Sequence, residues 1–522
     1  MIKERSLIRN TAGVGVGTFL SRITGLIREV LISSFFGASW VTDAFFIAYT
    51  IPNLLRRLFA EGALSTSVIP VFSQYSEQDH QDSQKFISAV FSGLTLTVSV
   101  VCLIGIIFSP WIVDIVGVGF RSDPEKIQMA TNMTRIMFPF LLIISWSALL
   151  MGVLNTLQVF SWSAIAPVFF NAGTIVTLVV LKTFAGPYSL ALGILIGGLG
   201  QFAIQLYPFY KKGFSLRFIR EFWNNAGFRE VIGLMFPVAL ALAVGQVNTL
   251  VDRVIASTCQ EGAVSALYYA DRLLELPMGI FGIALSTAIL PSLSQLIFKK
   301  NTDEWKQTLY QGMRLVIYIM VPVTTYLAIF RTEAIRLVYE RGLFDASATI
   351  MTAQSLLFYV PGLTFFSLNH VITKAFYSLK DTVTPVRISV IMVGMNIFLD
   401  LLLVRYLSFS GLALATSLVA FLNYYLLVFF LKKNHPFYEK DGLFKPWFLK
   451  VITLNLLFVG ACLGILQLVS GLRDTFHLVG FFGVSIILLS VFYIVISRYM
   501  GLNEAKAVWS FFVRKVRGRG KG

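Results

Sequence analysis

The chain has 522 residues, of which 56% are hydrophobic and only 13% are charged. Soluble domains carry about 25% charged residues, so this composition excludes a soluble enzyme, a secreted scaffold and a disordered chain. The net charge of +16 indicates Lys and Arg gathered at the cytoplasmic face of a membrane protein rather than a nucleic-acid partner.

Apolar stretches long enough to cross a bilayer recur along the whole chain. We expect them at 8–35, 42–72, 86–116, 128–155, 161–183, 188–210, 229–257, 264–297, 307–330, 350–376, 383–405, 411–431, 447–470 and 477–499. Inside a bilayer the backbone of such a segment must be hydrogen-bonded within itself, as it is in a helix. The sequence therefore predicts an all-α polytopic membrane protein with fourteen transmembrane helices.

The distribution of basic residues predicts how these helices are oriented. An even number of spans places both termini on one side of the membrane. Lys and Arg are far more numerous in the two terminal segments and in the loops of that side than in the opposite loops. Because basic residues accumulate in cytoplasmic loops, both termini are predicted to be cytoplasmic.

One motif occurs twice. Residues 63–74 (ALSTSVIPVFSQ) match residues 284–295 (ALSTAILPSLSQ) at seven of twelve positions, 221 residues apart. Pro167 and Pro385 recur at nearly the same separation. The two copies lie in spans 2 and 8, so the repeat unit is six spans long. We expect two six-helix lobes of the same orientation, related by an axis along the membrane normal and facing a central cavity.

The chain is accordingly expected to have five parts. Residues 1–210 form the first lobe with spans 1–6, and residues 229–433 form the second with spans 7–12. Between them, 211–228 has aromatic residues at helical spacing among basic ones, which predicts an amphipathic helix on the cytoplasmic surface. Residues 434–500 hold spans 13 and 14, outside the repeat. Residues 501–522 form a basic cytoplasmic tail suited to anionic lipid.

Ionisable residues are concentrated in spans 1, 2, 7 and 8. A charge at mid-membrane costs at least about 2.5–3.5 kcal/mol, so each should face a partner or a water-filled cavity. Either the arginines and carboxylates neutralise one another, or they line the cavity. The residues are Arg22, Arg28, Glu29, Asp43, Arg56, Arg57, Glu61, Asp252, Arg253, Asp271, Arg272 and Glu275.

The cations of this set are all arginines, which favours an anion site. A planar guanidinium binds two oxygens of a phosphate or carboxylate at once. Arg22 and Arg28 lie on span 1, where neighbouring glycines are expected to bend the helix so that both face the cavity. Arg56 on span 2 can face the same site. This arrangement suits a pyrophosphate.

A second group offers hard oxygen ligands. Asn396 and Asp400 are four residues apart and therefore on one face of span 11, while Asp252 lies on span 7 and Thr416 on span 12. Carboxylate, amide and hydroxyl oxygens suit Na⁺ or a proton better than a transition metal. The alternative is that Asp252 pairs with Arg253 or another arginine and that Asp400 faces the membrane interface.

The sequence carries no sign of an enzyme. It has no nucleotide-binding loop, no zinc-protease motif and no nucleophile elbow. Its three cysteines lack the spacing of a disulfide framework or a thiolate metal site. We therefore expect a transporter without a cofactor, driven by an ion gradient, the membrane potential or the gradient of its substrate.

Several motifs resemble those of the MurJ (MviN) family of lipid II flippases. They are 25–29 (GLIRE), 42–46 (TDAFF), 52–63 (PNLLRRLFAEGA) and 268–277 (YYADRLLELP), and the resemblance extends from span 1 through at least span 12. It implies a monomeric bacterial inner-membrane protein of the MOP exporter superfamily. Such a protein carries the undecaprenyl-pyrophosphate-linked peptidoglycan precursor from the cytoplasmic to the periplasmic leaflet by alternating access. The implied partners are lipid II and membrane lipids, with no nucleic acid or nucleotide.

Matched residue by residue, the resemblance implies two sites. Glu29 stands where the family often has Asp. The substrate-binding residues are Arg22, Arg28, Arg56, Arg272, Glu29, Asp43, Glu61, Ser265, Asp271 and Glu275. The set that resembles the family's sodium site is Asp252, Asn396, Asp400, Leu412 (through its carbonyl) and Thr416.

The resemblance also implies a transport path. The headgroup enters between spans 1 and 8, and the polyprenyl tail lies in a groove along spans 13 and 14. Three alternatives stay open: a cation-coupled exporter of small amphiphiles, a flippase for another polyprenyl-linked saccharide, and a scaffold for cell-wall enzymes without transport.

Overall fold

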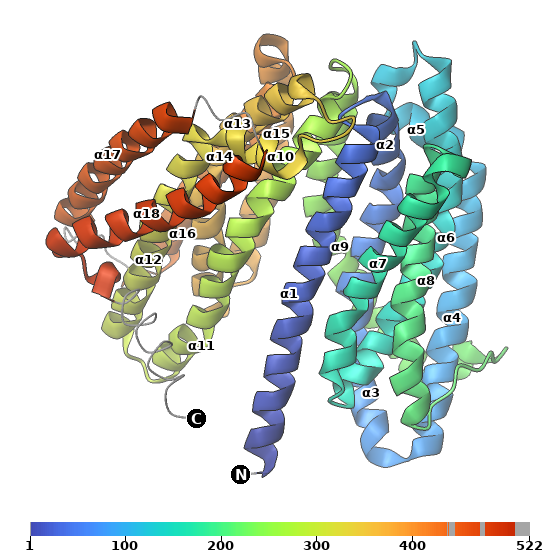
Figure 1. Ribbon diagram of the computed structural model, residues 1–522. Coiled ribbons are helices and arrows are strands. Elements are labelled where there is room, and N and C mark those ends of the chain that lie inside the picture. The colour runs from blue at the N-terminus through green and yellow to red at the C-terminus, as the bar shows by residue number, and fades with distance from the viewer. Residues whose placement is uncertain (1, 436, 438–443, 470–474, 507–522) are drawn as a thin grey trace. The chain divides into compact units, whose positions relative to one another are not determined.

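The computed structural model describes residues 2–435, 437, 444–469 and 475–506 (Figure 1). These residues form helices joined by turns and irregular segments, with no strand among them, which confirms the all-α prediction. They divide into two compact units, Met1–Ser265 with Arg341–Asp345, and Ala266–Glu340 with Ala346–Gly522. This division differs from the predicted lobes, since the seventh predicted span belongs to the first unit.

The first unit contains the first six predicted spans and the seventh. Two of its helices begin with clear caps, as the side chain of Asp123 accepts from the backbone N–H of Glu125 and that of Asn225 from Phe228. The elements are α1 (Ile2–Phe36), α2 (Trp40–Leu55), the π-helix η1 (Arg56–Leu64), α3 (Ser65–Gln78), α4 (His80–Ile107), α5 (Ser109–Val116), the 3₁₀ turn η2 (Val118–Phe120), α6 (Pro124–Thr156), α7 (Phe160–Ala185), α8 (Tyr188–Lys211), the 3₁₀ turn η3 (Phe222–Asn224) and α9 (Ala226–Ser257).

Helix α6 is the centre of this unit, and α2, α4 and α8 pack around it. Helix α9 packs against α2, η1, α3, α4 and α5. Its first turn is fixed by the ring of Phe228, which lies so close to Gly93 of α4 that a Cβ there would come within 2.3 Å. The backbone N–H of Gly119 also donates to Ser257 Oγ at 3.1 Å. These contacts explain why α9 groups with the first six spans.

Helix α1 runs alongside α7 (Figure 1), and a glycine sets the distance between them. A Cβ on Gly17 would lie 2.9 Å from the backbone of Ala164 in α7, whereas a Cβ on Gly15 would meet nothing within 4 Å. Only a residue without a side chain therefore fits at position 17.

We expect Gly17→Ala to destabilise the protein by about 1–3 kcal/mol, because the added methyl group must push α1 away from α7. Gly15→Ala, two residues away on the same helix, is the matched control and should not destabilise it. Thermal unfolding of the purified variants in detergent measures the difference. Equal unfolding midpoints for Gly17→Ala and the wild type would contradict this account of the α1–α7 contact.

The predicted amphipathic helix at 211–228 is wrong. Helix α8 ends at Lys211, and after it the chain is irregular apart from η3 until α9 begins at Ala226. Side chains of α4 take the backbone hydrogen bonds that a helix would have used: Gln84 binds both the N–H (2.9 Å) and the C=O (2.6 Å) of Ser215. Ser92 Oγ accepts from the N–H of Ile219 at 2.8 Å. The segment is a strap across α4, anchored by buried Phe214.

We expect Gln84→Ala to release this strap. The loss of two hydrogen bonds, each contributing about 0.5–1.5 kcal/mol, should raise the rate of tryptic cleavage after Arg217 roughly tenfold. Lys85→Ala is the control, because Lys85 is exposed and pairs only locally with Asp82. Cleavage of Gln84→Ala at the wild-type rate would show that other contacts hold the strap.

The second unit contains the remaining predicted spans. Asn301 caps its second long helix, accepting from the N–H of Glu304. Its elements are α10 (Ala263–Pro277), the π-helix η4 (Met278–Ile283), α11 (Ala284–Phe298), α12 (Thr302–Ile329), α13 (Arg331–Tyr339), α14 (Ala346–Ser378), α15 (Val383–Leu407), α16 (Phe409–Asn434), α17 (Phe444–Val469) and α18 (Thr475–Tyr499).

Helix α14 is central here and packs against α11, α12, α13 and α16. The last two helices are fastened to α12 by polar contacts. Tyr318 pairs with Ser497 of α18 at 2.7 Å, and Thr325 donates to Asn455 of α17 at 3.0 Å. Helices α17 and α18 are therefore a fixed part of this unit, although they lie outside the sequence repeat.

A π-helical segment precedes α3 and another precedes α11, and these helices carry the two copies of the repeated motif. The copies begin at Ala63, near the end of η1, and at Ala284, directly after η4. A π-helix has an extra residue in the turn and often occurs at functional sites. The repeat seen in the sequence is thus matched by a local irregularity at the same place in both copies.

All fourteen predicted spans fall on helices. Eleven helical stretches among the described residues are long and apolar enough to cross a membrane. The predicted spans not among these eleven are those of α1, of α2 to α3, and of α9, which carry many of the intramembrane charges. The chain is a multi-pass membrane protein, and the count of fourteen stays a prediction. The basic tail at 507–522 lies outside the described residues.

Candidate functional site

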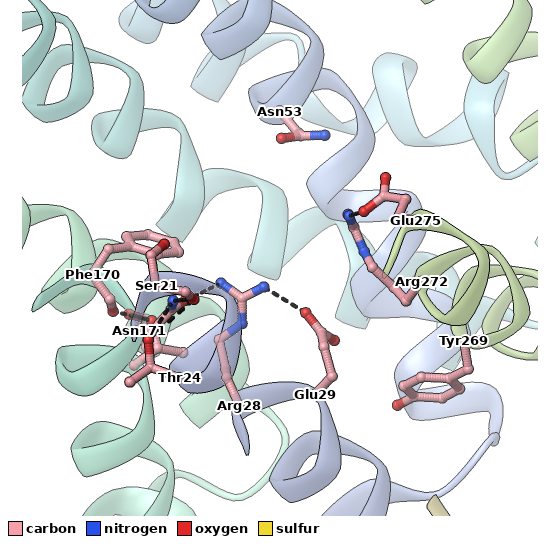
Figure 2. A network of polar contacts seen from close by, with 12 residues as sticks. Ser21, Thr24, Arg28, Glu29, Asn53, Phe170, Asn171, Tyr269, Arg272 and Glu275 are labelled. Atoms are coloured by element: carbon pink, nitrogen blue, oxygen red, sulfur yellow. Dashed lines mark hydrogen bonds and ion pairs between the residues drawn. The ribbon is translucent and has the colours of Figure 1, made fainter. Parts of the chain in front are cut away.

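Arg28 of α1 is held between two side chains, as Figure 2 shows. Its guanidinium donates to Asn171 Oδ1 at 3.0 Å and forms an ion pair with the neighbouring Glu29. Its Cζ also lies 5.4 Å from the ring centroid of Phe170. The side chains of Arg28 and Glu29 are only 17% and 5% exposed. The guanidinium is therefore both desolvated and fixed in orientation.

Asn171 of α7 is a functional candidate that sequence reasoning missed. Its amide donates to the backbone carbonyl of Ser21 and to Thr24 Oγ1, both at 3.1 Å, while its oxygen accepts from Arg28. One side chain thus joins α1 to α7 and orients the arginine. A buried amide within an otherwise apolar span, four residues after Pro167, was the available signal.

The other arginines predicted in the first unit have different surroundings. Arg56, the first residue of η1, donates from Nε (3.1 Å) and Nη2 (2.9 Å) to Asn53 Oδ1. Arg22 is exposed, and it makes no hydrogen bond or ion pair within the described part of the chain. The side chain of Glu61, in η1, lies outside the described residues. Asn53, which orients Arg56, was also not predicted.

Asp43 of α2 and Ser265 of α10 were implied separately, and the structure brings them together. The Asp43 carboxylate accepts from the backbone N–H of Gly262 (2.6 Å), the N–H of Ser265 (2.8 Å) and the Ser265 hydroxyl (2.6 Å). Both residues are buried. Free N–H groups and a partial positive charge mark a helix N-terminus, so the carboxylate caps α10 from another helix.

This contact joins nearly equivalent positions of the two repeat copies, since Asp43 and Ser265 are 222 residues apart. The turn before α10 is held a second time, because Glu261 accepts from the N–H of Trp40 at 3.1 Å and pairs with Lys126 at 3.7 Å. We name this set, Asp43, Gly262 and Ser265, the α2–α10 latch; all three residues belong to the first unit, which includes the first turn of α10.

In the second unit, Arg272 of α10 forms an ion pair with Glu275 one turn later (Figure 2). Its Cζ lies 4.8 Å from the ring centroid of Tyr268, and its side chain is 27% exposed. Asp271, on the same helix, is exposed. Glu275 and Tyr268, both on α10, therefore orient the Arg272 guanidinium. A planar guanidinium must be oriented in this way before it can bind two oxygens of a ligand.

The predicted ion ligands are only partly brought together. Asn396 Nδ2 donates to Asp400 Oδ2 at 2.6 Å on α15, and both side chains are fully buried. On the adjoining α16, the Thr416 hydroxyl donates to the Leu412 carbonyl at 3.0 Å. Asp252 belongs to the first unit. Within the described residues no three His, Cys, Asp or Glu side chains cluster as metal ligands. The buried carboxylate of Asp400 beside the amide of Asn396 offers oxygen atoms that suit a hard monovalent cation or a proton.

Comparison with known proteins identifies the family. The family model described as "Lipid II flippase MurJ" matches residues 32–499. A probable lipid II flippase MurJ of Vibrio cholerae is 36% identical over 438 residues, covering 81% of this chain and 82% of that protein. A lipid II flippase MurJ of Burkholderia cenocepacia is 35% identical over 470 residues, covering 87% of this chain and 89% of that protein.

Comparison with solved structures agrees with these sequence matches. A lipid II flippase MurJ in an inward closed conformation superposes with a TM-score of 0.78 at 29% identity, covering 93% of this chain and 99% of that one. An inward-facing multidrug resistance MATE family transporter of the MOP superfamily shares the fold, with a TM-score of 0.63 at 13% identity. The superposition covers 79% of this chain and 95% of that one. A flippase is a transporter rather than an enzyme. With most of its length matched by one family, the chain belongs to the MurJ family of lipid II flippases.

Proposed function

We propose that this protein moves lipid II, the lipid-linked peptidoglycan precursor, from the cytoplasmic to the periplasmic leaflet of a bacterial inner membrane. The observation that carries this proposal is the match to the lipid II flippase family over residues 32–499. The chain also covers more than four fifths of the relatives from Vibrio cholerae and Burkholderia cenocepacia. Both termini are cytoplasmic in this proposal, as the positions of the basic residues favour.

The pyrophosphate of lipid II binds to Arg22, Arg28, Arg56 and Arg272. This assignment is supported by the way three of these guanidinium groups are oriented: by Asn171 and Glu29, by Asn53, and by Glu275 with Tyr268. A guanidinium has five N–H donors in a rigid fork, so one that is already oriented binds phosphate oxygens with little further loss of entropy. Glu61 and Asp271 complete the proposed site.

Transport proceeds by alternating access, and the α2–α10 latch closes one of the two access routes. Support comes from its geometry: a buried carboxylate holds three donors at the start of α10. Binding of the pyrophosphate and release of Asp43 from Gly262 and Ser265 are linked steps of the cycle. The polyprenyl tail stays in lipid beside α17 and α18, and the protein works as a monomer.

A Na⁺ ion or a proton resets the cycle. The proposed ligands are Asp252, Asn396, Asp400, Thr416 and the carbonyl of Leu412. The support is that Asp400 and Asn396 are fully buried side by side, where their carboxylate and amide oxygens suit a hard cation. Such a cation supplies the charge neutralisation when bound. Asn396 and Asp400 on α15 and Leu412 and Thr416 on the adjoining α16 provide oxygen ligands, and Asp252 is on α9 of the first unit.

Depletion of the protein in its own host tests the function. We expect lipid II to accumulate in the cytoplasmic leaflet and wall synthesis to stop before cells lyse, with both defects reversed by re-expression. Altered resistance to small amphiphiles with normal wall synthesis would instead favour a cation-coupled exporter. Accumulation of a different polyprenyl-linked saccharide would identify another substrate. Normal leaflet distribution of lipid II in depleted cells would refute the proposal.

A further inference from the structure

The second unit contains a cavity that the proposed transport path does not use. Its volume is about 570 Å³, and it is lined by α11, α12, α14 and the residues that follow α18. Every lining residue belongs to the second unit. The polar side chains of its lining are Ser292, Thr308, Gln311, Arg314, Asn503 and Glu504. The rest of the lining is apolar. A cavity that combines an apolar wall with a few charged and polar groups suits an amphiphilic ligand with a charged part.

Two opposite charges line this cavity. Arg314 of α12 is held by α17, because its Cζ lies 5.3 Å from the ring centroid of the buried Trp447. Glu504 Oε2 is buried and has no hydrogen-bond partner among the described residues. A buried carboxylate oxygen without a donor is unfavourable. A ligand with a cationic N–H group would supply the missing donor.

The corresponding turn of α4 in the first repeat copy has no arginine, since the residues 221 and 222 positions before Arg314 are Gly93 and Ser92. There the space is filled by the rings of Phe228 and Phe222, which a Cβ on Gly93 would approach to 2.3 Å and 3.1 Å. The first unit therefore closes this position with aromatic packing. The second unit has a cation, a stacked tryptophan and an open cavity at the same place.

One end of the cavity lies near the boundary between bilayer and water, while Leu285 and Arg314 lie deeper, at least three turns from the end of α11 and from the start of α12. Ser292 is within two turns of the end of α11, Thr308 is within two turns of the start of α12, and Glu504 follows the end of α18. In the proposed topology these helix ends are cytoplasmic. Headgroups of inner-leaflet lipids occupy this level, with their acyl chains beside the helices.

We propose that this cavity binds the headgroup of a zwitterionic amino-phospholipid. Arg314 binds the phosphodiester and Glu504 binds the primary ammonium group. A net-anionic headgroup would bring negative charge toward the Glu504 carboxylate and would offer it no ammonium N–H. A choline headgroup is cationic but has no N–H to donate to Glu504. The bound lipid would bridge α12 to the segment after α18 and so stabilise the unit that holds α17 and α18.

Purified full-length protein tests this with three phospholipids of matched acyl chains. Ethanolamine lipid should raise the thermal unfolding midpoint more than glycerol or choline lipid does, and native mass spectrometry should show it retained in preference. Arg314→Ala should lower that retention on the order of tenfold, since a charge-assisted contact is lost. Glu504→Gln should reverse the preference toward the glycerol lipid. Arg498→Ala, an exposed arginine at the end of α18, is the control and should keep the wild-type ranking.

Equal retention of the three lipids by the wild type would overturn the proposal, as would an unchanged ranking in Glu504→Gln. The Glu504→Gln variant keeps the test decisive if Arg314→Ala fails to fold, because it leaves the Arg314–Trp447 contact in place. These experiments contain no lipid II, so neither result bears on the proposed flippase activity, which the depletion experiment tests separately.

Discussion

Arg28→Ala is expected to abolish the ability of this protein to support growth when it is the only flippase in the cell. Arg28 is the most firmly positioned of the proposed pyrophosphate ligands, fixed by Asn171, Glu29 and the ring of Phe170. Loss of a charge-assisted contact costs about 1.5–3 kcal/mol, on the order of a 100-fold loss of pyrophosphate affinity at the upper end. Complementation of a depletion strain, with protein levels measured by immunoblot, gives the result.

Arg28→Lys sharpens this test. Lysine keeps the positive charge but cannot contact Asn171, Glu29 and a phosphate from one plane, so we expect it to fail as well. Arg121→Ala is the control, because Arg121 is exposed and pairs with Asp114 at a surface turn. Normal growth of Arg28→Ala at wild-type protein levels would remove Arg28 from the substrate site.

Asp43→Ala should have the second large effect, by opening the α2–α10 latch. The change leaves two buried donors without their acceptor, the N–H groups of Gly262 and Ser265. The Ser265 hydroxyl also loses Asp43 but keeps Thr42 Oγ1 as a partner at 2.8 Å. Each buried unsatisfied donor costs about 1–3 kcal/mol, so the closed arrangement loses several kcal/mol relative to the open one. The start of α10 should then be exposed to water for much longer.

Thiol labelling measures this opening. Val264 lies inside the latch and is 1% exposed, so Val264→Cys, with Cys102, Cys259 and Cys462 replaced by serine, should react slowly with maleimide. Adding Asp43→Ala should speed labelling at least tenfold. Ser265→Ala removes one of the three hydrogen bonds to Asp43, and its effect should be smaller. Labelling of the Asp43→Ala variant at the unmodified rate would mean that the latch does not control access.

Much of the fold could be predicted from the sequence, because long apolar stretches in a bilayer have few alternatives to the helix. The predicted spans at 42–72 and 264–297 are each broken by a π-helix, η1 or η4, which hydrophobicity does not reveal. The strap was misassigned for a physical reason. Its aromatic spacing suits a helix, but Gln84 and Ser92 of α4 bind its backbone instead.

The site was predictable as a set of residues but not as a set of contacts. Charges within apolar spans and the family resemblance pointed to Arg28, Asp43 and Ser265. Their partners come from distant parts of the chain: Asn171 lies 143 residues beyond Arg28, and Ser265 lies 222 residues beyond Asp43. A single sequence contains no information on which polar residues of different helices meet, and this is why Asn171 was missed.

The binding of a diphosphate by arginine is tested most directly by measuring lipid binding to the purified protein in nanodiscs. Polyprenyl carriers with a diphosphate or a monophosphate should be compared on the wild type and on Arg28→Ala with Arg272→Ala. We predict that the wild type prefers the diphosphate on the order of 100-fold and that the double variant loses this preference. A double variant that still prefers the diphosphate as strongly as the wild type would contradict the assignment of these arginines.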